Sequence, residues 1–179
     1  MTHTKNIIPV LLAVTLLALI ILTCCGGDNT RSKDVMNSLA KVTERKNFDD
    51  LSLTIYYIDP LILTRAPLSV DRLINFRSVK IIIINGNDMK EQISLFKQIN
   101  KDDLIPADDI SLIDARFYYV FESAKDGKLF EVAMWGEDYS IFVNEQEVRE
   151  NDIFYNVIIP FLSEDAKTVL EAYLGRELT

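Results

Sequence analysis

The sequence predicts a single α+β domain in which helices pack against a mostly antiparallel sheet of about five strands. Asp126-Gly127 joins two strand-like segments in the manner of a β-hairpin, and apolar residues at helical spacing lie between and after the strands. Hairpins combined with covering helices are typical of the α+β class. Segments of strand length, alternating or wholly apolar, occur at 51–58, 79–84, 116–122, 129–135 and 139–143.

The first two strand segments differ in their patterns. In 51–58, Leu51, Leu53 and Ile55 alternate with other residues, as in a strand that buries one face. The segment 79–84 reads VKIIII and is apolar on both faces from Ile81 onward. A strand of this kind is typical of a sheet covered on two sides, so we expect 79–84 to be an interior strand.

Helix start signals accompany the remaining segments. Asp88 and Glu91 form the pattern of a capping box that opens a helix over 88–101. Asn144-Glu145 predicts a second tight turn after the last strand of the meander. One stripe of the 88–101 helix is apolar: Met89, Ile93, Phe96 and Ile99. Three further residues are expected to cap helices: Ser69 before 70–76, Asn151 before a helix interrupted at Pro160, and Ser163 before a last helix that ends at Gly175.

The N-terminus reads as an export signal. Met1 to Asn6 carries Lys5, and Ile7 to Thr23 follows without a charge. At about 1.5 Å per residue this apolar run gives a helix of roughly 26 Å, slightly shorter than the ~30 Å hydrocarbon core of a bilayer. Length alone therefore leaves a retained anchor helix open.

The end of the apolar run resembles bacterial lipoprotein precursors. In that family a Leu, a small or β-branched residue and a small residue precede the cysteine that receives diacylglycerol, and Leu22 to Cys25 matches this order with Cys25 as the lipidated residue. The departure is Cys24, where the family prefers Gly, Ala or Ser, and Cys24 is the second choice for lipidation. The resemblance implies a cell-membrane protein held by its lipid, with the domain on the extracytoplasmic side. Two alternatives stay open, an uncleaved anchor helix and secretion after cleavage.

We expect the chain to have three parts. These are a signal peptide with a lipobox over 1–25, a polar tether over 26–47 and a single globular domain over 48–179. Apolar residues with helical spacing lie inside the second part, so a short helix there is as compatible with the sequence as a tether. These residues are Val35, Met36, Leu39, Ala40 and Val42.

Composition excludes several kinds of chemistry. After the signal the chain carries a net charge of about −9, because Lys5 is one of the 19 basic residues and all 27 acidic ones follow residue 24. Binding to nucleic acid needs clustered basic residues and is not expected. His3 is the only histidine and lies before the apolar run, so neither a Ser-His or Cys-His nucleophile nor a histidine zinc site is expected in the domain. We predict no metal and no cofactor.

Carboxylates are the remaining candidates for catalysis or ion binding. Paired acids can hydrolyse glycosides or bind calcium without histidine, yet their spacing here matches no EF-hand loop, and a solvated acidic loop is the more common meaning of such a segment. A cell-wall glycan hydrolase that uses these acids with Glu122 is the alternative function. The acids are Asp102, Asp103, Asp108, Asp109 and Asp114.

Aromatic residues suggest a binding surface. Tyr56 and Tyr118 lie in two predicted strands, and if these strands are neighbours the two rings can form a small platform for a sugar or a peptide. Cross-strand packing is the more common role of such pairs. Trp135, the only Trp, is a further candidate contact residue. The favoured function is therefore a non-catalytic binding domain at the cell envelope whose partner is a protein or a glycan, with a purely structural envelope component as a third option.

Overall fold

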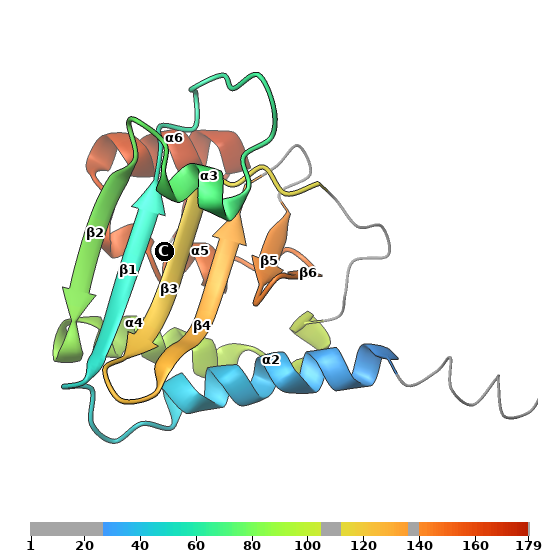
Figure 1. Ribbon diagram of the computed structural model, residues 1–179, viewed down its shortest axis with the longest axis vertical. Helices are drawn as coiled ribbons and strands as arrows, with labels where there is room; N and C mark the ends of the chain where they lie inside the picture. Colours follow the sequence, from blue (N-terminus) through green and yellow to red (C-terminus); the bar gives the residue numbers. More distant parts are fainter. Residues whose placement is uncertain (1–26, 105–111, 136–139, 179) are drawn as a thin grey trace, which may run out of the picture.

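The computed structural model describes residues 27–104, 112–135 and 140–178. They form one α+β domain in which helices pack against a six-stranded sheet, as the sequence predicts (Figure 1). The elements in chain order are α2 (Gly27–Thr43), β1 (Leu51–Tyr57), α3 (Val70–Ile74), β2 (Lys80–Asn85), η1 (Gly86–Met89), α4 (Lys90–Leu95), η2 (Phe96–Gln98), η3 (Lys101–Leu104), β3 (Phe117–Ser123), β4 (Gly127–Met134), β5 (Ile141–Val143), β6 (Gln146–Val148), α5 (Ile153–Asn156), η4 (Ile159–Phe161) and α6 (Glu164–Leu174).

The sheet is antiparallel throughout, with strand order β2-β1-β3-β4-β5-β6. From β3 onward it is a meander of hairpins. Gly127, with φ of 71°, turns the first hairpin, and Asn144 and Glu145, with φ of 47° and 66°, make the tight turn between β5 and β6. Both turns lie where the sequence predicts them, because each requires a left-handed backbone that Gly and Asn adopt readily.

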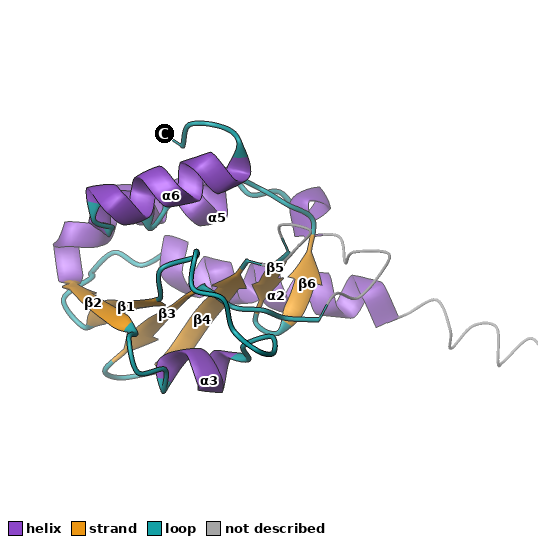
Figure 2. Ribbon diagram, turned by 90° about the horizontal axis from the view of Figure 1, so that it is seen from above, coloured by secondary structure: helices purple, strands orange, loops and turns teal. Residues whose placement is uncertain are grey.

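The face of the sheet that we call the closed face is covered by helices. Helices α5 and α6 lie on this side and α3 lies on the other (Figure 2). Side chains from α2, α4, α5 and α6 join those of the strands in one core. The strands contribute Leu53, Ile55, Phe117, Tyr119, Phe121, Phe130 and Val132.

The opposite face, which we call the open face, has less cover. Short helix α3 and the segments around it pack against the middle of this face and form a second, smaller core. Ile58, Leu68, Leu73, Ala115, Tyr118, Val120, Ala133 and Phe142 make up this core. The alternation of side chains along each strand thus serves two cores of unequal size.

The interior position predicted for the isoleucine strand is wrong. Strand β2 is an edge strand that pairs only with β1 among the described strands. Ile84 is buried and Ile82 is partly buried on the closed face, whereas Ile81 is 54% exposed and Ile83 is 63% exposed on the open face. Cover on both faces requires a neighbouring layer on each side, and the short α3 does not extend over this edge (Figure 2).

The polar tether predicted over 26–47 is also wrong for the part that the structure describes. Residues Gly27–Thr43 form helix α2, which packs against β4 and α4 (Figure 1). Val35, Leu39 and Val42 are buried in the closed-face core. The core therefore begins within this helix and not near Phe48, because the helically spaced apolar residues find a partner surface.

Most of the predicted helix signals are confirmed. The Ser69 hydroxyl accepts a hydrogen bond from the Arg72 amide, and the Ser163 hydroxyl accepts one from the Ala166 amide. The stripe from Met89 to Ile99 is buried, although the helix is broken into η1, α4 and η2. The capping box at Asp88 does not form, because Asp88 lies inside the 3-10 turn η1 and Met89, not Asp88, is the N-cap of α4. In the described residues no helix is both long enough and apolar enough to cross a bilayer.

Candidate functional site

A pocket of about 520 Å³ lies on the open face between α3 and strands β3 to β5. Its wall is mainly apolar, and the residues that make it so are Val70, Ile74, Ile113, Tyr118, Ala133 and Phe142. Four charged residues also line it: Asp71, Lys128, Glu131 and Glu145. An apolar concavity with a few placed polar groups is the usual form of a ligand site.

The polar groups of this pocket are held in a short chain of hydrogen bonds. The Tyr118 hydroxyl donates to Glu131 Oε2 at 2.7 Å, and Lys128 Nζ donates to the same oxygen at 2.9 Å. Burial, together with the hydrogen bond to the Glu131 carboxylate, raises the pKa of Tyr118 well above its usual range. The Tyr118 hydroxyl is therefore protonated at neutral pH and acts as a donor.

The turn between β5 and β6 fixes the backbone of Glu131. The Glu131 amide donates to Asn144 Oδ1 at 3.0 Å, and the Asn144 amide donates to the Glu131 carbonyl at 3.0 Å. Asn tolerates the left-handed backbone that this turn needs, and its side chain reaches the neighbouring strand. The residue that makes the turn thus also positions the pocket carboxylate.

Tyr56 and Tyr118 are neighbours, as the platform hypothesis requires. They are paired in the β1–β3 register, and their ring centroids are 5.8 Å apart with an interplanar angle of 33°. Tyr118 is only 5% exposed, whereas Tyr56 is partly exposed. In the same register Tyr56 lies beside Ile81 of β2, so an apolar strip runs from the pocket across Tyr118 and Tyr56 to the sheet edge.

Trp135 does not belong to this surface. Its ring lies in the closed-face core, 8% exposed, and stacks on Tyr173 of α6 with the ring centroids 3.5 Å apart. The ring of Phe117 packs against the Trp135 ring, with the two ring centroids 6.1 Å apart. The predicted binding surface of Tyr56, Tyr118 and Trp135 is therefore divided between the two faces, and only the tyrosines lie together.

The acidic segment is only partly described. Asp114 Oδ1 accepts hydrogen bonds from the Leu68 amide at 2.8 Å and from Arg116 Nη1 at 2.6 Å, which is a structural role. Asp102 and Asp103 lie in η3. Asp108 and Asp109, like Cys24 and Cys25, lie outside the described residues.

Glu122, the further acid of the hydrolase hypothesis, is exposed on the open face and pairs in register with Lys128. Within the described part of the chain no group of three or more His, Cys, Asp or Glu residues is arranged to hold a metal ion.

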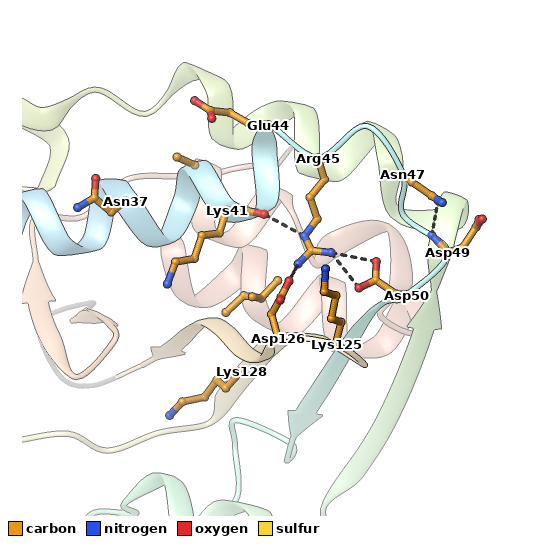
Figure 3. A pocket seen from close by; sticks show the side chains of 12 residues that line it. Asn37, Lys41, Glu44, Arg45, Asn47, Asp49, Asp50, Lys125, Asp126 and Lys128 are labelled. Carbon is orange, nitrogen blue, oxygen red and sulfur yellow. Dashed lines mark hydrogen bonds and ion pairs between the residues drawn. The ribbon is translucent and has the colours of Figure 1, made fainter.

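A second hollow, of about 890 Å³, lies where α2 meets the β3–β4 hairpin (Figure 3). Arg45 is the centre of an ion-pair network there. Its guanidinium donates to both oxygens of Asp50 at 2.9 Å and 3.0 Å, to Asp126, and to the carbonyl of Lys41. The Ser123 hydroxyl donates to Asp50 Oδ2 at 2.5 Å.

These contacts lower the pKa of the Asp50 carboxyl, with the hydrogen bond from Ser123 as the largest cause and Arg45 as the next. Because Arg45 joins the end of α2 to the start of β1 and to the hairpin, we assign this network a structural role. The charges of Arg45, Asp50 and Asp126 are largely compensated within the network, whereas an ion-binding site has uncompensated charge.

Sequence reasoning missed Lys128, Glu131 and Phe142. One signal was available, because Glu131 is the only charged residue inside the apolar segment LFEVAMW. A carboxylate within a buried strand needs partners, and such a residue is a good candidate for a site. Comparisons with family models, with curated proteins and with solved structures found no match for this chain.

Proposed function

We propose that this protein is a lipid-anchored extracytoplasmic domain that binds a component of the cell envelope without catalysis, and that the open-face pocket is its binding site. The anchoring part of the proposal depends on the lipobox-like sequence at Leu22 to Cys25. The binding part depends on the pocket. A single observation carries it: an apolar concavity of about 520 Å³ contains a buried Tyr118–Glu131 hydrogen bond at its wall.

The lining of the pocket indicates the chemistry of its ligand. Three carboxylates line it, Asp71, Glu131 and Glu145, against one cation, Lys128. This charge favours a neutral or cationic group over an anionic one. The apolar wall formed by Ile74, Ala133 and Phe142 suits an aliphatic or aromatic group. We expect a ligand that combines the two, such as an apolar peptide side chain next to a basic one.

Mass spectrometry of the N-terminus extracted from membranes tests the anchor. We expect a diacylglycerol adduct on Cys25 that disappears in a Cys25→Ser variant and persists in a Cys24→Ser variant. An adduct that disappears only with Cys24→Ser would move the lipid to Cys24. An unmodified and unprocessed chain in the cytosol would remove the anchoring proposal.

Site-specific photo-crosslinking in the native envelope tests the pocket. A photoreactive residue at Leu112, on the pocket rim and 74% exposed, should crosslink one defined partner. The matched control is Leu63, which is 97% exposed but does not line the pocket. Glu131→Gln should reduce the Leu112 product and leave any Leu63 product unchanged. Equal products from the two positions, or turnover of a substrate by the purified protein, would contradict a non-catalytic pocket.

A further inference from the structure

The outer edge of strand β2 has no partner in the described part of the chain. The strand pairs with β1 on one side over six residues, from Lys80 to Asn85, without a register shift. On the open face its Ile81 and Ile83 are more than half exposed. An edge of this kind presents unpaired backbone groups and apolar side chains together, and another strand commonly adds to a sheet at such an edge.

The two edges of the sheet differ. The opposite edge is β6, which has three residues, Gln146–Val148, and includes Glu147. Short edge strands with charged residues discourage pairing with another chain. Strand β2 is twice as long, contains no proline and no bulge, and has a charge only at its first residue, Lys80. The protections that proteins usually place on an edge strand are thus largely missing at β2.

We propose that β2 pairs with β2 of a second copy of this chain, antiparallel and about a two-fold axis at Ile82, so that the two sheets become continuous. Directly opposed residues of an antiparallel ladder either both point their backbone groups across the pair or both point them away. In a symmetric pair of identical strands the axis must therefore pass through a residue and not between two residues.

The register centred on Ile82 is self-complementary. It places Ile81 opposite Ile83 of the second copy and Ile83 opposite Ile81, all on the open face. The alternative centred on Ile83 leaves Ile81 opposite Asn85. Only the first register pairs every exposed isoleucine with another, and cross-strand pairs of β-branched residues stabilise a sheet.

Charge complementarity favours a second copy as the occupant. Exposed Arg77 precedes β2 and exposed Lys80 is its first residue, so this end of the strand is basic. The segment after its other end carries exposed Asp88 and Glu91 with one lysine, Lys90. A two-fold antiparallel arrangement brings the basic end of each copy to the acidic end of the other. Opposite charges then meet at both ends of the new strand pair.

The first test is the mass of the full chain in detergent micelles at micromolar concentration, measured by light scattering with the detergent contribution subtracted. We expect two copies for the wild type. Ile83→Lys should raise the dissociation constant at least about 100-fold, because the change occurs twice in the dimer and each buried isoleucine contributes about tenfold. The control is Leu63→Lys, which removes an even more exposed apolar residue in a loop, 97% against 63% for Ile83, and should leave the dimer intact. A monomeric wild type, or a dimer that persists in Ile83→Lys, would overturn the proposal.

The second test addresses the register. Ile81→Glu and Ile83→Lys should each be monomeric alone and form a heterodimer when mixed. The proposed register places the two changed positions opposite each other on one side of the axis and leaves native Ile81 opposite native Ile83 on the other side. Near-ultraviolet circular dichroism of Trp135 and the buried tyrosines verifies that each variant is folded. Folded variants that stay monomeric when mixed would overturn the register. Because this dimer does not involve the lipid or the pocket, its failure would leave the proposed function untouched.

Discussion

The two faces of one sheet differ in what covers them. On the closed face, side chains from α2, α4, α5 and α6 bury Phe117, Tyr119 and Phe121 completely. On the open face, α3 and its flanking segments cover the centre and leave a pocket beside Tyr118 and exposed isoleucines at the β2 edge. The same strands supply both faces, so the difference comes from the layers above and below them. The larger core of buried apolar side chains lies on the closed face, and the pocket and the exposed isoleucines of β2 lie on the open face.

Substitution of two adjacent residues of β3 tests the comparison with the largest expected change in the free energy of unfolding. Phe121 points to the closed face, where its ring contacts Phe96 and Phe130, and Val120 points to the open face. Phe121→Ala should lower the free energy of unfolding by about 4 kcal/mol, because it leaves a large cavity. Val120→Ala removes two methylene equivalents and should cost about 2 kcal/mol. Urea unfolding followed by Trp135 fluorescence measures both, and equal losses would break the comparison between the faces.

A substitution in helix α2 has the second largest expected effect on the free energy of unfolding. Leu39 is 2% exposed and belongs to the closed-face core, so Leu39→Ala should cost about 3 kcal/mol. The matched control is Asn37→Ala on the exposed side of the same helix, which should change the free energy of unfolding by no more than about 0.5 kcal/mol. The same unfolding measurement applies. If Leu39→Ala were as mild as the control, residues 27–43 would behave as the tether that the sequence first suggested.

On the open face, the tyrosine pair gives a smaller effect. Tyr118→Phe removes the hydroxyl that donates to Glu131 and should cost about 1.5 kcal/mol, as expected for a buried hydrogen bond to a charged group. Tyr56→Phe keeps the neighbouring ring in place and is the control, with little expected change. If Tyr118→Phe left the stability unchanged, water or Lys128 would fully replace the hydrogen bond that the Tyr118 hydroxyl donates to Glu131. Thermal unfolding of the two variants side by side separates these outcomes.

The smallest expected effect on stability is the pH-dependent contribution of Asp50, which lies where the end of α2 meets the sheet. Ser123 and Arg45 lower the pKa of Asp50 in the folded protein below its ordinary value of 3.8. This contribution to stability is therefore complete above that value and is lost as the pH falls through the folded-state pKa. The difference in urea midpoint between wild type and Asp50→Asn should shrink as the pH is lowered through this range. Ser123→Ala should reduce the pH-dependent part, and a difference that stays constant with pH would contradict this role.

Local patterns were sufficient where the physical cause is local. Alternation located β1, the Asp126-Gly127 and Asn144-Glu145 turns were found from their backbone requirements, and the Ser69 cap was confirmed. The position of β2 was not predictable in this way. A run of four isoleucines has the same pattern whether a layer covers one side or two, and strand order decides between them.

The candidate site was found only in part for a similar reason. The register of β1 and β3 brings Tyr56 beside Tyr118, which the sequence could state only as a condition. Trp135 was a candidate contact residue because tryptophan is common at binding surfaces. It lies in the closed-face core instead, because α6 packs across that face and Tyr173 stacks on its ring. Glu131 and Lys128 meet Tyr118 through the pairing of β3 with β4, whose register shifts between Phe121 and Glu122, and no sequence motif specifies that register.

The sequence by itself determined the α+β class, most of the elements and the absence of histidine from the domain, because periodicity, turn residues and composition act over short stretches of chain. The tertiary structure decided which face of the sheet is covered, that β2 lies at an edge, that α2 belongs to the core and that a pocket opens beside Tyr118. These features depend on the order in which strands pair and on the layers that pack over them. Contacts between residues far apart in the chain create them, and no single segment encodes such contacts.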